Sequence, residues 1–184
     1  MKEPTDPIVQ VGAPVLRQKA KPVAKKEFGS RALKALISKM KRALAKEEFG
    51  VAIAAPQVGS PLRVFVVAGR VFDEPRRKPE LGKQNSGSPA KVFINPELTR
   101  FSRKTKEMSE GCLSVRGKYG TVPRHERVTV RAQDESGKPF TYHATGLVAQ
   151  IFQHEAEHLE GVLFIDRASR VWDDADMEAN QEYE

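Results

Sequence analysis

The sequence predicts an α+β fold in which mixed or antiparallel strands surround a central helix that carries a His-Glu-x-x-His motif, with a further helix near the N-terminus. Two stretches with apolar residues at helical spacing, about 31–47 and 145–161, carry this prediction, together with β-branched apolar runs between them. A chain of 184 residues has the length of one domain. We therefore expect a single domain over residues 1–172, with an exposed loop inserted at 70–90 and an acidic tail at 173–184.

The composition, 39% hydrophobic and 30% charged, is typical of a soluble globular protein. No targeting segment is visible at the N-terminus, and no apolar run approaches the roughly 18 residues that a membrane span needs. A single cysteine excludes an internal disulfide, so the fold does not depend on an oxidising compartment. We expect a protein of the cytoplasm, or of an organellar matrix if imported, with no membrane partner.

Charge is distributed unevenly along the chain, whose formal net charge is +7. Six of the 24 acidic residues lie in 173–184, where there is no Lys or Arg, so residues 1–172 carry 31 positive and 18 negative charges. Such a surface is typical of proteins that work near RNA, and equally of a solvated face that aids solubility. Both interpretations stay open, because basic and aromatic residues do not interleave as in a nucleic-acid-binding module. We expect no DNA partner.

The N-terminal segment contains four prolines, at positions 4, 7, 14 and 22, and is therefore predicted to run as an extended arm. Ser30 is a suitable N-cap for the first helix, in which five apolar residues recur at helical spacing: Leu33, Leu36, Ile37, Met40 and Leu44. The runs 63–68 and 91–94 are β-branched and apolar and predict strands, the second ending before Asn95-Pro96. Residues 71–90 between them include three prolines and two glycines and predict an exposed loop.

Residues 127–133 and 139–144 alternate apolar and polar side chains around Asp-Glu-Ser-Gly, which predicts a β-hairpin. The second helix is expected to begin near Thr145 and to end at Gly161, a residue type suited to the position after a helix. The run Val-Leu-Phe-Ile-Asp that follows is short, apolar and strand-like.

Residues 154–158, His-Glu-Ala-Glu-His, place two histidines four residues apart inside the second helix. At about 100° per residue His154 and His158 point the same way, close enough to bind one metal ion. Glu155 flanks the ion and suits a general base that takes a proton from water. Glu157 and Glu160 point toward the opposite side, where we expect them in solvent. By itself this motif also occurs by chance.

A tetrahedral site that keeps one position for water needs a third protein ligand. The one cysteine, Cys112, lies about forty residues before His154 in the segment Glu-Gly-Cys-Leu-Ser. A lone cysteine is more often a small buried hydrophobe than a ligand. The residues alone leave both interpretations open.

Three segments share their residues, order and spacing with one enzyme family: Gly-Val-Ala-Ile-Ala-Ala-Pro-Gln at 50–57, Glu-Gly-Cys-Leu-Ser at 110–114 and Gln-His-Glu-Ala-Glu-His at 153–158. With them the sequence resembles the peptide deformylases, which remove the N-formyl group from newly made bacterial and organellar proteins. The resemblance spans nearly the whole chain outside the 70–90 loop and the acidic tail. It implies an α+β fold whose central helix carries the histidines, as the pattern predicts.

Carried over position by position, the family's metal ligands and catalytic glutamate fall on Cys112, His154, His158 and Glu155. The resemblance also implies that the side-chain amide of Gln57 and the backbone N–H of Leu113 bind the developing oxyanion. The implied ion is one Fe²⁺, which Zn²⁺, Ni²⁺ or Co²⁺ can replace; a thiolate and two imidazoles do not by themselves decide between them. The implied substrates are nascent formyl-methionyl peptides, with transient ribosome contact, and we expect a monomer.

Eight residues are expected to bind substrate. Some precede His154 on the same face of the helix, and the others are given by alignment with the family: Gly50, Val51, Ala52, Met108, Gly111, Leu147, Gln150 and Ile151. Two of them depart from the family pattern. Ala52 replaces a glycine, and we expect its methyl group to intrude where the peptide approaches. Gln150 is more polar than expected for a pocket that holds a methionine side chain.

Two rival functions remain. A zinc endopeptidase would share the His-Glu-x-x-His motif and use Glu178 as third ligand, but Gly161 and the strand-like run after it interrupt the required helical connection. A non-catalytic relative would bind nascent chains or ribosomal RNA through its basic body. The presence of Glu155 beside the ligands argues against that reading, because a binding protein needs no proton carrier.

Overall fold

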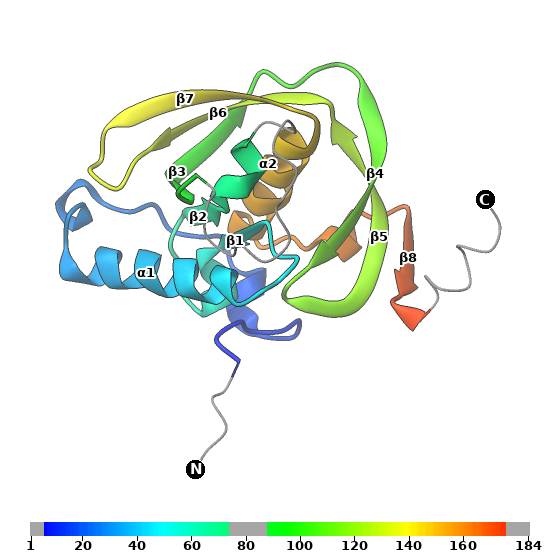
Figure 1. The fold of residues 1–184 in the computed structure, drawn as a ribbon, viewed down its shortest axis with the longest axis horizontal. Coiled ribbons are helices and arrows are strands. Elements are labelled where there is room, and N and C mark those ends of the chain that lie inside the picture. The colour runs from blue at the N-terminus through cyan, green and yellow to red at the C-terminus, as the bar shows by residue number, and fades with distance from the viewer. Residues whose placement is uncertain (1–5, 74–87, 176–184) are drawn as a thin grey trace, which may run out of the picture.

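The computed structural model describes residues 6–73 and 88–175, which fold into two antiparallel β-sheets and two α-helices (Figure 1). The helices are α1 (Arg31–Ala45) and α2 (Gly146–Leu159). The five-stranded sheet, in spatial order, contains β1 (Ala52–Ala54), β2 (Val64–Val67), β3 (Lys91–Thr99), β6 (Arg127–Gln133) and β7 (Pro139–Thr145). The three-stranded sheet contains β4 (Thr105–Cys112), β5 (Val115–His125) and β8 (Arg170–Asp173). The expected α+β class is confirmed.

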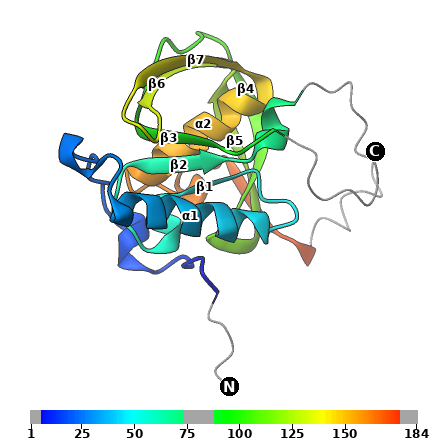
Figure 2. The same ribbon diagram turned by 60° about the vertical axis from the view of Figure 1, so that its left-hand side comes forward.

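Strands β1 and β2 of the five-stranded sheet lie between the two helices (Figure 2), and the burial of β2 shows why. All four residues of β2 are buried. Val64 and Val66 pack in the apolar cluster that includes the buried face of α1, whereas Phe65 and Val67 pack in the cluster that includes α2. Successive side chains of a strand point to opposite faces, so one fully apolar strand serves both helices.

Helix α1 confirms the predicted cap and buried face. The Ser30 hydroxyl accepts a hydrogen bond from the Leu33 N–H at 3.2 Å. The residues buried at helical spacing include Leu33, Ile37, Met40 and Leu44. The helix ends at Ala45, two residues before the predicted end at 47.

The β4–β5 ribbon is the main feature that the sequence pattern missed. Of the eight residues of β4 only Glu110 is buried, so the strand lacks the alternation that predicts a half-buried strand. The ribbon turns at Leu113-Ser114, directly after Cys112. Strands β1 and β8 were also missed, because each spans only a few residues.

Three local expectations were wrong. The N-terminal arm is not extended throughout, because it forms 3₁₀ turns at Pro14–Arg17 and Lys25–Glu27. The run after Gly161 is not a strand; it contains a 3₁₀ turn at Phe164–Asp166, where the Asp166 carboxylate accepts the Leu163 N–H at 2.8 Å. Strand β3 continues past Asn95-Pro96 to Thr99 through a bulge between Ile94 and Glu97.

Parts of two other expectations lie outside the described residues. The 70–90 loop begins with a 3₁₀ turn at Gly69–Phe72, and residues 74–87 are not described. The acidic tail contributes its first residue to β8, and residues 176–184, which include Glu178, are not described. No helix in the described ranges is long and apolar enough to cross a membrane.

Helix α2 is the element that positions the site. Ala149, Phe152 and Leu159 are buried in its cluster with the five-stranded sheet, and the Phe152 ring lies 4.9 Å from that of Phe93. The helix ends at Leu159, two residues before the predicted end at Gly161, which follows the cap residue with φ +76°. A Cβ atom at Gly161 would lie 2.7 Å from the Arg17 carbonyl oxygen, so the chain passes the N-terminal segment too closely for any other residue.

Gly161→Ala should therefore destabilise the fold more than Gly59→Ala. Gly59 also has a positive φ, +84°, but a Cβ there meets no atom within 4 Å. The backbone strain common to both changes costs about 1–2 kcal/mol, and the clash at Gly161 should add about 1–3 kcal/mol. Urea unfolding of the two variants measures the difference, and equal losses would contradict the close approach seen here.

Candidate metal centre and active site

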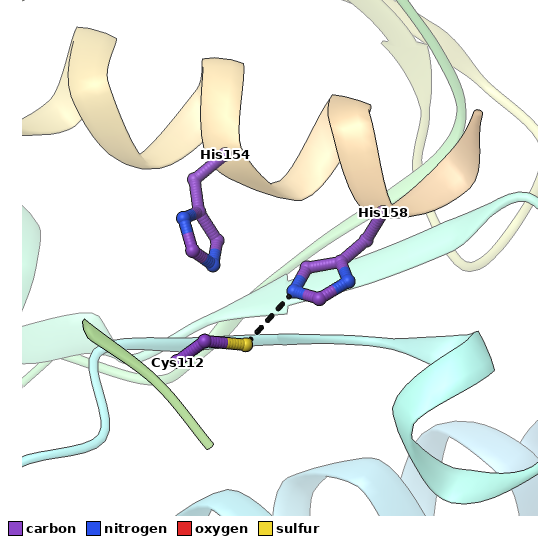
Figure 3. Close-up of side chains that lie close together, drawn as sticks. All are labelled: Cys112, His154 and His158. Carbon is purple, nitrogen blue, oxygen red and sulfur yellow. Dashed lines mark hydrogen bonds between the residues drawn. The ribbon is translucent and has the colours of Figure 1, made fainter. Parts of the chain in front are cut away.

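Cys112, His154 and His158 converge at one place (Figure 3). The histidines lie one helical turn apart on α2, with ring centroids 5.0 Å apart, and Cys112 is the last residue of β4. One ligand atom of each residue lies within 4.8 Å of the others, and Cys112 Sγ is 3.2 Å from His158 Nε2. The three predicted ligands are thus brought together from two elements that are distant in sequence.

The environment of Cys112 favours the thiolate. Burial alone would raise the pKa of the thiol. The positive charges of His158 and His154, and their hydrogen bonds with the sulfur, outweigh this effect and lower the pKa to about 5. The Ser114 N–H, 3.4 Å away, also donates to the sulfur. The thiolate is the form that binds metal ions, so the cysteine is prepared as a ligand at neutral pH.

This donor set fits a divalent metal ion. One thiolate and two imidazoles are ligands that Fe²⁺, Zn²⁺, Ni²⁺ and Co²⁺ accept, and three protein ligands leave a coordination position for a reactant. Glu155 Oε2 and His158 Nδ1 are the buried side-chain atoms, among the residues that the structure describes, that have no hydrogen-bond partner. An orphaned carboxylate oxygen beside a ligand cluster indicates a place where water or substrate binds.

Glu155 is 3% exposed and lies next to the first histidine in sequence. Burial raises the pKa of its carboxyl group to about 7, against the charges of His154 and His158, which lower it. A pKa near the working pH suits a group that both accepts and releases a proton.

Gln57 lies in a 3₁₀ turn, Ala55–Val58, and is 1% exposed. Its Oε1 accepts the Ala54 N–H at 2.8 Å, which directs Nε2 toward Ser114 Oγ at 3.2 Å and Cys112 Sγ at 3.6 Å. Leu113 follows Cys112 in the turn of the ribbon. Both residues therefore stand beside the ligand cluster, and their role as oxyanion donors stays a prediction.

Two of the expected substrate-binding residues are glycines that packing requires. A Cβ atom at Gly50 would lie 2.8 Å from the Glu47 Cβ, and one at Gly111 would lie 2.9 Å from the Tyr119 ring. Both allow close packing, at the end of α1 and within the β4–β5 ribbon respectively.

The other expected walls differ in exposure. Val51 and Met108 are half-buried, Ile151 is buried and Leu147 is 54% exposed at the start of α2. Ala52 is buried in the apolar cluster between the sheet and α2, so the expected effect of its methyl group on the cleft stays a prediction. None of these placements by itself tests a contact with substrate.

Gln150 is not simply a polar pocket wall. It is 7% exposed, and its Nε2 donates to the Ser109 carbonyl at 2.8 Å and to Glu110 Oε1 at 3.3 Å. Its polarity is explained by these contacts, which attach α2 to β4.

Glu110 is the functional residue that sequence reasoning missed. Its Oε2 accepts the Nδ1–H of His154 at 2.9 Å, which leaves Nε2 of that histidine for the ion. Burial would raise the pKa of Glu110, but hydrogen bonds with Arg124 and His154 lower it to about 2. The available signal was its position in the same Glu-Gly-Cys-Leu-Ser segment, two residues before Cys112.

Glu157 was expected in solvent, and this was wrong. Its side chain is 22% exposed and receives two contacts of 2.8 Å from Arg124 of β5, which reaches it across the helix. Glu160 is exposed as expected and pairs with Lys19 and Arg63.

Two imidazoles and a thiolate around one point, with a buried carboxyl group alongside, fit the active site of a metal-dependent hydrolase. Comparison with known proteins identifies the family. A model of the polypeptide deformylase family matches residues 5–173, and the peptide deformylase of Thermus thermophilus is 39% identical over 176 residues, which cover 95% of this chain and 88% of that protein. The chain therefore belongs to the polypeptide deformylase family.

Solved structures agree with this assignment. A class I type b peptide deformylase from Acinetobacter baumannii, solved with Met-Ala-Ser bound, has a TM-score of 0.75 and 35% identity and covers 90% of this chain and 100% of that one. The peptide deformylase of Thermotoga maritima has a TM-score of 0.72 and 35% identity, covering 89% and 97%.

Cys112→Ser should lower the affinity for Co²⁺ or Zn²⁺ by at least about 100-fold, because even outer-shell changes cost 10–100-fold. In the parent protein the affinity should fall progressively as the pH drops. Protons compete first for the His154 imidazole, because its hydrogen bonds with Cys112 and Glu110 outweigh burial and raise its pKa well above the ordinary value, and below about pH 5 they also compete for the sulfur. Competition with a chromogenic chelator measures both effects. His143→Gln, which removes a histidine of β7 outside the cluster, is the control. Unchanged metal binding in Cys112→Ser would contradict the ligand assignment.

Proposed function

We propose that this chain removes the N-formyl group from peptides that begin with formyl-methionine and releases formate. The observation that carries the proposal is the buried, unpartnered Glu155 carboxylate beside Cys112, His154 and His158. Membership of the polypeptide deformylase family supports it. The Acinetobacter neighbour holds Met-Ala-Ser, the peptide that deformylation of formyl-Met-Ala-Ser would yield.

The chain's own groups account for the proton transfers. When bound, the ion activates water and polarises the formyl carbonyl as a Lewis acid. Glu155 accepts a proton as water adds to the formyl carbon, and delivers it to the nitrogen as the C–N bond breaks. Formate and a free α-amino group result. Gln57 Nε2 and the Leu113 N–H donate to the oxygen that becomes negative, each contributing about 2.7–4 kcal/mol.

We propose Fe²⁺ as the native ion, with Zn²⁺, Ni²⁺ or Co²⁺ able to replace it. The thiolate and imidazole ligands suit each of these ions, so metal analysis of protein purified without oxygen decides between them. Val51, Met108, Leu147 and Ile151 are proposed to hold the methionine side chain, since they are the apolar residues expected around this cleft.

The rival functions have less support. An endopeptidase of the type considered above would need a third ligand from beyond the helix, whereas Cys112 already lies 3.2 Å from His158. A protein that only binds nascent chains has no use for a glutamate whose pKa is raised to about 7 beside the ligands.

Formate release from formyl-Met-Ala-Ser should be metal-dependent, and Glu155→Gln should lower kcat/KM by about 10²–10⁴-fold while metal content stays unchanged. Glu160→Gln, at the exposed residue directly after the same helix, should behave like the parent. Coupled detection of formate measures the rate, and metal analysis runs in parallel. Metal-loaded parent protein that releases no formate would refute the proposed function, and cleavage of internal peptide bonds would favour the endopeptidase.

We also propose that the protein is a monomer of the cytoplasm, or of an organellar matrix, and that it contacts ribosomal RNA transiently through the outer face of α1. The helix contains five Lys or Arg residues and no acid. Arg31, Lys34 and Arg42 are exposed and lie opposite the buried face. A basic stripe of this kind neutralises backbone phosphates.

Changing Arg31, Lys34 and Arg42 together to Glu should weaken salt-sensitive binding to ribosomes by about 10-fold or more, because these contacts release counterions. Formate release from a free peptide should not change. The control carries the same charge change on β6 and in the turn that follows it, with Arg127, Arg131 and Lys138 replaced by Glu. Co-sedimentation across a salt series measures binding, and equal losses in both variants would show a general charge effect rather than a docking face.

A further inference from the structure

Arg124 of β5 joins two carboxylates, which contact adjacent edges of its guanidinium and share Nη2. Nε and Nη2 donate to Glu110 at 2.6 and 2.8 Å, and Nη1 and Nη2 contact Glu157 at 2.8 Å each. The arginine and Glu110 side chains are each 3% exposed. Two fork-shaped contacts on one planar group fix its orientation more strictly than a lysine could.

The inner end of this arrangement reaches the metal centre. Glu110 accepts the Nδ1–H of His154 at 2.9 Å, so the arginine is two hydrogen bonds away from a ligand that it does not touch. Without Arg124, the buried Glu110 carboxylate would lose the arginine charge that compensates its own and two of its hydrogen bonds. The orientation of the His154 ring therefore depends on a residue of the neighbouring strand.

The outer end reaches a different surface. Glu157 and Arg124 line a groove of about 980 Å³ that also includes Gln153 and Ala156 of α2. His154 and His158 do not line it. The contacts Glu157–Arg124–Glu110–His154 therefore run from this groove to the ligand cluster.

We propose that Arg124 is a positioning residue for the metal centre, held by Glu157 and acting through Glu110 on the orientation of His154. Outer partners of metal-bound histidines typically change metal affinity by 10–100-fold. Arg124 is assigned no direct contact with substrate. The proposal rests on the metal site of the proposed function, but not on which bond that site hydrolyses.

Arg124→Lys tests this role, because it keeps the charge and removes the fork. Co²⁺ should dissociate about 10–100-fold faster than from the parent protein, and its visible absorption bands should shift as His154 reorients. Arg63→Lys is the matched control, since Arg63 pairs with Glu160 near the end of the same helix at 2.6 Å and has no contact with Glu110. The control should keep the parent's Co²⁺ dissociation rate and spectrum.

A double-mutant cycle shows whether the effect passes through Glu110. In a Glu110→Gln background, Arg124→Lys should change the Co²⁺ dissociation rate by less than about 3-fold, because the link to His154 is already weakened. Equal effects of Arg124→Lys in both backgrounds would overturn the proposed route.

A purely structural role gives a different result. Arg124→Lys would then lower the melting temperature and leave the Co²⁺ dissociation rate and spectrum of the folded protein unchanged, which would overturn the proposal. If Arg124→Lys does not fold, Glu157→Gln decides: faster Co²⁺ loss supports the proposal and an unchanged rate refutes it. A failure of the formate assay does not affect these measurements, so the two proposals fail separately.

Discussion

The carboxylate of Glu110 is the group on which the geometry of the centre depends. It accepts hydrogen bonds from Arg124 of the adjacent strand and from His154 and Gln150 of α2. It thereby attaches the helix with the two histidines to the strand that ends in Cys112. A buried charge of this kind is stable only when each lone pair has a partner, and here three side chains supply them. The contacts that supply the carboxylate with hydrogen bonds also hold the ligand side chains in position relative to one another.

The surroundings of the ligand cluster give neighbouring carboxyl groups different protonation behaviour. Burial and hydrogen bonding push the pKa values of two neighbouring carboxyl groups apart, to about 2 for Glu110 and about 7 for Glu155. Glu110 therefore stays ionised and orients a histidine, whereas Glu155 can exchange a proton near neutral pH. Cys112, with a pKa lowered to about 5, supplies the negative ligand between them.

The local features of the structure could be predicted from the sequence. The Ser30 cap, the buried face of α1 and the β6–β7 hairpin follow from residue types at fixed spacing. The β4–β5 ribbon could not be predicted in this way, because β4 buries little and its polar residues show no alternation. The solvated position expected for Glu157 was wrong because helical spacing does not reveal a partner on another strand.

The sequence by itself determined that His154 and His158 point the same way, since four residues make slightly more than one helical turn, and that Glu155 stands beside them. Motif resemblance added Cys112 and Gln57 as candidates. Only the tertiary structure decided that Cys112 Sγ lies 3.2 Å from His158, that the Gln57 amide faces the sulfur, and that Glu110 accepts hydrogen bonds from both His154 and Arg124. These contacts join residues between 14 and 55 positions apart, where local spacing no longer fixes the distance between side chains and only the packing of α2 against the ribbon does.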